Sequence, residues 1–148
     1  MTGPDLYFED VEIGGDIGPV ERTVTDDQVA EFVRNWGDFS QPSRFTDAEF
    51  ARQEGLPGPI VPGALSMALM GQLVVDRSST FALSKLDVVF RGLVPHHVPL
   101  KLSGIITDKG VVDGEPQFEC DVILEDQQGV RLVIGRATVG VPMRVAAG

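Results

Sequence analysis

The stretch PGALSMALMGQLVVD, residues 62–76, decides the fold of this chain. The proline at its start suits the first turn of a helix, and nearly every position after it is apolar or small. A helix that is apolar all round is buried rather than laid on a surface. The Gly, Ala and Ser positions within it would let another part of the chain lie close. The sequence therefore predicts a central helix enclosed by the rest of the domain.

The residues after this helix change to a period of two and are rich in β-branched side chains, which is typical of strands. Four strands are predicted, at residues 83–94, 98–107, 117–125 and 131–141. Asp113-Gly114 and Gln128-Gly129 mark turns, and strands joined by short turns pair antiparallel. One buried helix and a meander of long strands predict an α+β domain with a single hot-dog fold, an antiparallel sheet wrapped around a buried central helix.

An extended region and two short helices are predicted before the central helix. Residues 6–24 are expected to be extended. Thr25 and Gln28 have the spacing of a capping box, and the next apolar residues fall on one helical face, with Gly37 as the C-terminal stop. These apolar residues are Val29, Phe32, Val33 and Trp36. Thr46 to Glu49 repeats the capping pattern and predicts a second helix that Gly55 ends.

Composition narrows the possible partners and location. The 148 residues predict one domain, spanning residues 1–148. With 12 basic and 22 acidic residues the net charge is −10, which disfavours binding to nucleic acid or to anionic membranes. The N-terminus lacks the basic and apolar regions of a signal peptide, so a cytoplasmic protein without a membrane partner is expected. A single cysteine, Cys120, excludes a disulfide framework and is interpreted as a buried, inert thiol.

With these elements in order, the chain resembles the MaoC-like family, which includes (R)-specific enoyl-CoA hydratases and 3-hydroxyacyl dehydratases. The resemblance covers nearly the whole chain, and it depends on the order and spacing of short motifs. These are YFEDVEIG at residues 7–14, VVFRGLV at 88–94 and GRATV at 135–139.

The functional signature of that family, Gly-Asp-x-Asn-Pro-x-His, is matched only in part. Gly37-Asp38 and Pro42 correspond to its Gly-Asp and its proline, and Gln41 stands at the asparagine position, with one extra residue between Asp38 and Pro42. The histidine position falls on Arg44 when counted from the proline and on Ser43 when counted from the aspartate. The chain therefore resembles a divergent member that lacks the motif histidine.

In the family, the aspartate and the histidine hold a water that adds across the double bond of a 2-enoyl thioester. The backbone amide of the glycine that opens the buried helix binds the thioester oxygen, where negative charge builds up. The resemblance implies that Asp38 and Gly63 keep these roles. It also implies substrate contacts, including a CoA phosphate at Arg91 and an acyl tunnel beside Met67. The substrate-binding positions implied are Gln41, Pro62, Ala64, Met67 and Arg91.

Arg44 cannot replace the histidine as a base, because a guanidinium remains protonated. Three roles are open to it: pairing with Asp38, which would lower the pKa of that carboxyl; binding a carboxylate or phosphate of a ligand; or lying on the surface. Asp38 itself has a structural alternative, which is to cap the turn that follows a helix.

The only two histidines, His96 and His97, are adjacent in a predicted loop. Adjacent side chains in extended backbone point apart, and few other ligands stand at metal-site spacing. We therefore predict exposed histidines and no metal, with a catalytic replacement for the motif histidine as the alternative.

The sequence as a whole predicts an acyl-thioester hydratase or dehydratase that acts on an unusual enoyl or 3-hydroxyacyl substrate. Its ligand would be a small-molecule acyl thioester of CoA or a carrier protein, with no separate cofactor. Hydration of plain enoyl-CoA is expected to be strongly reduced or absent. Two alternatives are a non-catalytic partner subunit of a heteromeric dehydratase and a hot-dog thioesterase. A hot-dog dimer joins the sheets of its two chains into one sheet, so a homodimer, or a heterodimer with another hot-dog chain, is expected.

Overall fold

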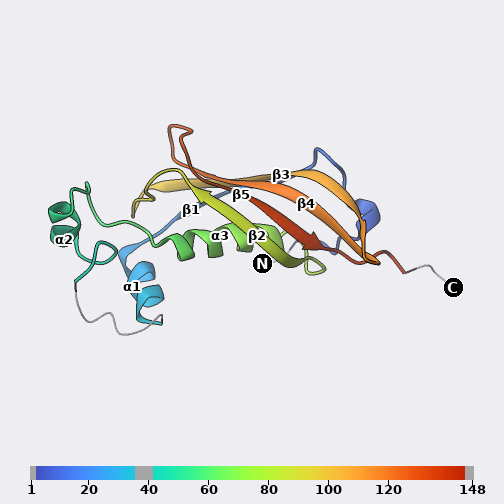
Figure 1. Ribbon diagram of the computed structural model, residues 1–148, viewed down its shortest axis with the longest axis horizontal. Coiled ribbons are helices and arrows are strands. Elements are labelled where there is room, and N and C mark those ends of the chain that lie inside the picture. The colour runs from blue at the N-terminus through green and yellow to red at the C-terminus, as the bar shows by residue number, and fades with distance from the viewer. Residues whose placement is uncertain (1–2, 36–41, 146–148) are drawn as a thin grey trace.

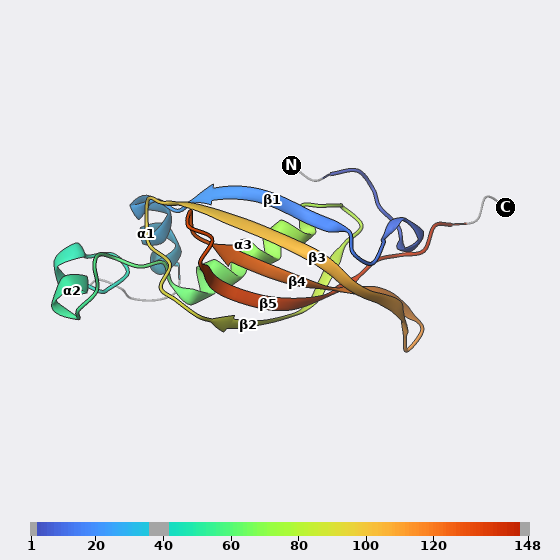
Figure 2. The ribbon, with the colours of Figure 1, turned by 90° about the horizontal axis from the view of Figure 1, so that it is seen from above.

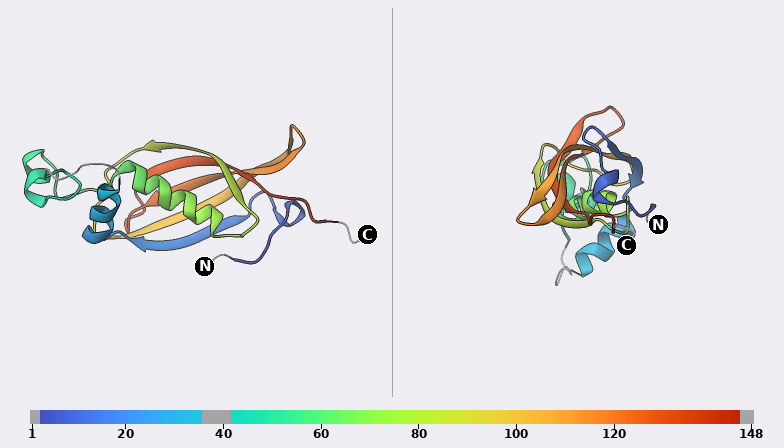
Figure 3. Two further views of the ribbon diagram at one scale, coloured as in Figure 1. Left: turned by 90° about the horizontal axis from the view of Figure 1, so that it is seen from below. Right: turned by 90° about the vertical axis from the view of Figure 1, so that its right-hand side faces the viewer.

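A long helix crosses one face of a five-stranded antiparallel sheet in the computed structural model, which describes residues 3–35 and 42–145 (Figures 1 and 2). The sheet order is β1-β3-β4-β5-β2, and every neighbouring pair is antiparallel. Seen end-on, the strands curl around the helix (Figure 3). The predicted α+β hot-dog fold is confirmed. The elements are η1 (Phe8–Asp10), β1 (Asp16–Thr23), α1 (Asp26–Arg34), α2 (Ala48–Gln53), α3 (Gly63–Val75), β2 (Ala82–Phe90), β3 (Pro99–Val112), β4 (Glu115–Glu125) and β5 (Arg131–Gly140).

Helix α3 is buried because the inner face of the sheet is apolar. Met70 and Val74 are fully buried on the helix, and Leu102 and Phe118 on β3 and β4 are buried with them in one core. Each such side chain contributes about 1.5–3 kcal/mol by leaving water. A Cβ atom at Gly71 would lie 3.1 Å from the Cδ2 of a leucine on β2. The small residues of α3 therefore allow the close approach that the sequence indicated.

Two predicted strands differ from the observed ones in length. Strand β2 ends at Phe90 rather than at residue 94, because Arg91 and Gly92 both turn their N–H groups to the carbonyl of Leu132. Strand β3 runs to Val112, five residues beyond its predicted end, and its hairpin with β4 extends past the rest of the sheet (Figure 2). Asp113 and Gly114 both have positive φ, 52° and 80°, as a tight hairpin turn requires.

The helix before the Gly-Asp motif begins as predicted. Thr25 accepts a hydrogen bond from the Gln28 amide at 3.2 Å, and the Gln28 side chain accepts one from the Thr25 amide at 2.9 Å. The described part of α1 ends at Arg34, so the predicted positions of Trp36 and Gly37 lie outside the described residues. In α2 the cap is Asp47, one residue later than predicted, and it accepts from the Phe50 amide at 2.8 Å.

Two further sequence expectations concern the single cysteine and membrane-spanning helices. Cys120 is fully buried on β4, and burial raises the pKa of its thiol to about 11, so the predicted inert thiol fits its surroundings. Among the described residues, none of the helices has both the length and the apolar character needed to cross a membrane.

Candidate functional site

The N-terminus of α3 offers backbone donors that no part of the described chain uses. Leu65 and Ser66 donate to the carbonyl of Pro62, at 3.0 and 3.2 Å. The amides of Gly63 and Ala64 donate to no acceptor within residues 3–35 and 42–145. The helix dipole adds a partial positive charge here, and free amides at such an end bind anionic oxygen. This end of α3 can therefore hold an oxygen that carries or develops negative charge.

The segment that enters α3 is held from three directions. The Ile60 amide donates to the Arg44 carbonyl at 3.0 Å, and the Val61 amide donates to the Val94 carbonyl at 2.7 Å. The Ile60 carbonyl lies 3.0 Å from the Nε2 atom of His96. Pro62, the N-cap residue, is buried. The position of the free amides is thus set by contacts with segments that precede and follow residues 60–62 in the sequence.

An aromatic ring lies against Gly63. A Cβ atom at this position would lie 2.9 Å from the Cζ atom of Phe90 on β2. Phe90 is half-exposed at 50%, so the ring forms one wall beside the free amide. Arg91 follows it and is exposed, which places this residue next to the ring. The predicted phosphate contact of Arg91 stays a prediction.

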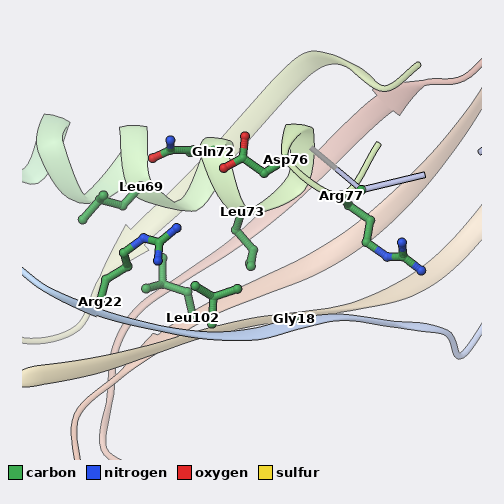
Figure 4. A pocket seen from close by; sticks show the side chains of 10 residues that line it. Gly18, Arg22, Leu69, Gln72, Leu73, Asp76, Arg77 and Leu102 are labelled. Carbon is green, nitrogen blue, oxygen red and sulfur yellow. The ribbon is translucent and has the colours of Figure 1, made fainter. Parts of the chain in front are cut away.

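Two hollows adjoin along the side of α3 that faces β1. The first, of about 300 Å³, is lined by Leu65 and Leu69 of α3 and by Asn35 at the end of α1. The second, of about 380 Å³, continues with Leu69 and Leu73. Arg22 of β1 lines both, and its side chain rises from the strand toward α3 (Figure 4). We call this combined space the α3 groove; its main walls are Leu65, Leu69, Leu73, Val20, Arg22 and Leu102.

The structure describes some of the predicted site residues and not others. Asp38 and Gln41 lie outside the described residues, so their predicted positions stay predictions. Gly63 and Ala64 form the donor end of α3. Met67 is half-buried, and it is not among the residues that line the α3 groove. The leucines at every fourth position, which the sequence analysis did not single out, line it instead; their spacing of four residues was a readable signal.

Arg44 is paired with an acid on the neighbouring helix. Its Nε atom lies 3.0 Å from Oε2 of Glu54, the C-cap residue of α2, and the Arg44 side chain is half-exposed. The Arg44 guanidinium lies at the surface beside Glu54, whereas its predicted pairing with Asp38 and its predicted ligand contact stay predictions. This pair ties the segment after Pro42 to α2.

The histidine prediction is right for the exposure of His97 and wrong for the burial of His96 and for the expected divergence of the two rings. His96 is buried, with 7% exposure, and its Nδ1 atom lies 2.7 Å from Oδ1 of Asp26. The Nε2 atom of His97 lies 2.9 Å from the same oxygen. The prediction assumed extended backbone, whereas His97 has a φ of 62°, which turns its ring toward that of His96. Hydrogen bonds from His96 and then His97 lower the pKa of the Asp26 carboxyl.

A buried helix wrapped by a five-stranded antiparallel sheet, with free amides at the start of that helix, defines a hot-dog protein. The sequence profile of the MaoC like domain matches residues 10–128, well over half of the chain. The chain therefore belongs to the MaoC-like dehydratase domain family.

Solved structures agree on the fold. The monoamine oxidase regulatory protein from Archaeoglobus fulgidus has a TM-score of 0.80 and 22% identity, covering 98% of this chain and 99% of its own. The (R)-hydratase from A. caviae involved in PHA biosynthesis has a TM-score of 0.80 and 20% identity, with 90% and 99% covered. The HadBC (3R-hydroxyacyl-ACP dehydratase) complex from Mycobacterium tuberculosis has a TM-score of 0.73 and 16% identity, with 86% and 96% covered. No curated protein matches in sequence.

Proposed function

We propose that this chain binds an acyl thioester and hydrates its enoyl form or dehydrates its 3-hydroxyacyl form. One observation carries the proposal: the amides of Gly63 and Ala64, which have no acceptor among residues 3–35 and 42–145, directly precede Leu65, the first α3 residue that lines the largely apolar α3 groove. A thioester needs both parts, a donor for its carbonyl oxygen and an apolar channel for its chain. The family to which the chain belongs is consistent with this chemistry.

The thioester oxygen would accept hydrogen bonds from the free amides, with the acyl chain lying beside Leu65, Leu69 and Leu73. The rise of an α-helix gives about 15 Å from Gly63 to Leu73, which sets the depth available to the chain. Donors fixed in advance at the oxygen stabilise the enolate that forms when the α-proton is lost. They are the main contribution of the described residues to the reaction.

Asp38 is the proposed base. It follows Asn35 by three residues, and Asn35 lines the same hollow as Leu65. Three residues of extended chain span at most about 10 Å, and we propose that this length brings the carboxylate to the first turn of α3. In dehydration, Asp38 would take the α-proton of the 3-hydroxyacyl thioester. The same proton would then pass to the departing 3-hydroxyl group, which leaves as water, and Asp38 would again be a carboxylate.

A partner is proposed at the β2 edge of the sheet. Val89 and Phe90 on this edge strand are 55% and 50% exposed. Charged residues and a register irregularity occur on both edge strands, features that discourage edge pairing, but β1 exposes no large apolar side chain. We propose a homodimer in which two β2 strands pair, which would also cover the ring beside Gly63. Light scattering of wild type and of V89E tests it: the variant should dissociate.

A second candidate function, a non-catalytic partner subunit, is favoured by one observation. Both histidines of the chain lie at Asp26, and Arg44 is occupied by Glu54. A carboxylate without an imidazole is a slow catalyst for simple substrates, because it cannot both orient water and exchange protons near neutral pH as histidine does. In that case the chain would shape the acyl channel of another hot-dog chain.

The deciding experiment assays the purified chain on a panel of enoyl-CoA and 3-hydroxyacyl-CoA substrates of increasing length. We expect crotonyl-CoA to be hydrated slowly or not at all, a longer or substituted substrate to turn over, and D38N to lose at least about 100-fold of that rate. E49Q, an exposed acid on α2, is the matched control. L69W should exclude long chains, whereas A68W, at its exposed neighbour, should not.

Three results would contradict the proposal. Ordinary turnover of the preferred substrate by D38N would remove the assigned base. Release of free thiol without formation of an enoyl or hydroxyacyl product would identify a thioesterase. Inactivity on every substrate, with activity restored by a co-purifying hot-dog chain that carries the full motif, would establish the partner subunit.

A further inference from the structure

We infer that Asp26, His96 and His97 form a binding site for one divalent transition-metal cation, where α1 begins beside the β2–β3 connection. Three potential ligand atoms, Oδ1 of Asp26, Nδ1 of His96 and Nε2 of His97, lie within 4.8 Å of one another. The two nitrogens are 2.7 and 2.9 Å from the same carboxylate oxygen. The inference does not depend on the proposed function, because none of these residues lines the α3 groove.

The backbone is bent to bring the two rings together. His97 has a φ of 62°, in the left-handed region, which a non-glycine residue adopts only when the surroundings enforce it. The amide of His97 donates to the Val24 carbonyl at 2.8 Å, and this bond holds the unusual conformation directly before the cap of α1. In extended backbone the rings would diverge. Local strain that gathers two imidazoles at one carboxylate points to a ligand site.

The contact of the His96 Nε2 atom with a backbone carbonyl fixes the direction in which the Nδ1 atom points. Its Nε2 atom lies 3.0 Å from the Ile60 carbonyl, an acceptor only, so Nε2 carries a proton. Nδ1 of His96 and Nε2 of His97 both face Oδ1 of Asp26, so three potential ligand atoms converge at one place. An imidazole held by a carbonyl through its other N–H is also the usual arrangement for a metal-binding histidine.

The ligand set selects the class of metal. Two imidazole nitrogens and one carboxylate oxygen suit Zn²⁺ and its first-row neighbours, whereas Mg²⁺ and Ca²⁺ prefer oxygen ligands. Bonds of about 2.0–2.2 Å in a tetrahedral site separate ligand atoms by about 3.3 Å, so the carboxylate oxygen must move away from each nitrogen by roughly half an ångström, and the two nitrogens, at most 4.8 Å apart, must settle at that same separation. The side chains of Asp26 and His97 are 66% and 59% exposed, which leaves them free to move.

A metal at this position would join three segments. Asp26 is the first residue of α1, the histidines belong to the β2–β3 connection, and His96 holds the Ile60 carbonyl of the segment that enters α3. The ion would thus fix α1 and the entry to α3 relative to each other. Three protein ligands leave a fourth position for water.

The experiment is calorimetric titration of the full-length, tag-free, metal-free chain with Zn²⁺, with Co²⁺ absorption as a second readout. We expect one Zn²⁺ per chain, a tetrahedral Co²⁺ spectrum, and no comparable binding of Mg²⁺. D26N and H97Q should each weaken Zn²⁺ binding by at least about 10-fold. D27N is the matched control, since it removes the same charge from the same turn of α1, and it should bind Zn²⁺ like wild type.

Both ligand variants change exposed side chains, so they should fold, and circular dichroism verifies this. Absence of Zn²⁺ binding by the wild type would overturn the inference and leave a proton between His96 and Asp26 as the explanation of the geometry. Equal weakening by D26N and D27N, or equal binding of Mg²⁺, would also overturn it, because either result would show general attraction to acidic groups.

Discussion

Replacing Gly135 by alanine should force two strands of the sheet apart. Gly135 lies on β5, opposite Val88 of β2. A Cβ atom there would lie 2.8 Å from the backbone carbonyl oxygen of Asp87 and 2.9 Å from Cγ1 of Val88. A carbonyl in a paired strand cannot swing aside as a side-chain end can. Overpacking of this kind typically costs about 1–3 kcal/mol of the free energy of unfolding.

Gly140 provides an internal control on the same strand. A Cβ atom there would meet the carbonyl of Ala82, also on β2, at an ordinary 3.6 Å. Neither glycine has positive φ, so alanine at either position gains the same unfolded-state entropy term of about 0.4–1 kcal/mol. The difference between G135A and G140A therefore isolates the overpacking cost. For a domain of this size it corresponds to a Tm difference of about 2–12 °C.

Urea unfolding followed by circular dichroism, at fixed protein concentration, measures both variants. We expect G140A to be as stable as wild type or slightly more stable, and G135A to be less stable with an unchanged m-value. Equal midpoints for the two variants would refute the reasoning, because they would show that β2 and β5 are not held at the observed separation.

Three further changes test individual parts of the structure. The hydroxyl of Ser66 is buried and has no hydrogen-bond partner among the described residues, so S66A should raise the unfolding free energy by about 1 kcal/mol; a loss would indicate a bound water or another partner. Because the reactive thiolate is suppressed by a pKa near 11 instead of 9.0, Cys120 should react with an aromatic disulfide reagent at pH 8 at least about 100-fold more slowly than free cysteine, and rapidly in denaturant; fast reaction of folded protein would contradict its burial. T25A should cost about 1 kcal/mol in urea unfolding by removing the cap bonded to Gln28, whereas T25S should be neutral; an equal loss in both would exclude the cap as the cause.

The fold could be predicted because its determinants are local and periodic. The continuous apolar run of α3, the alternation in β4 and β5, and the Asp113-Gly114 turn each specify one element without reference to distant residues. The end of β2 could not be predicted, because Arg91 and Gly92 leave the strand through bonds to Leu132, forty residues away. The same reason explains the shifted cap at Asp47, since a Thr-Asp pair offers two capping side chains and the sequence does not choose between them.

Of the candidate site, only the part formed by the first residues of α3 could be predicted from the sequence. Gly63 follows from the start of an apolar helix, and no tertiary information is needed to know that its amide has no acceptor within that helix. The meeting of His96 and His97 at Asp26 depends on one left-handed residue and on a contact across seventy positions, neither of which a pattern of polar and apolar residues contains. Arg44 had several possible partners, and choosing Glu54 required the packing of α2.

The short entry segment before α3 is anchored to Arg44, Val94 and His96, which belong to separate parts of the chain. Arg44 and Val94 contribute backbone carbonyls, which remain when the side chain changes, so only a substitution at His96 removes an anchor. Two anchors would then still hold the Gly63 and Ala64 amides in place. A lineage can therefore vary the side chains at positions 44 and 94 while the entry to α3 keeps its place.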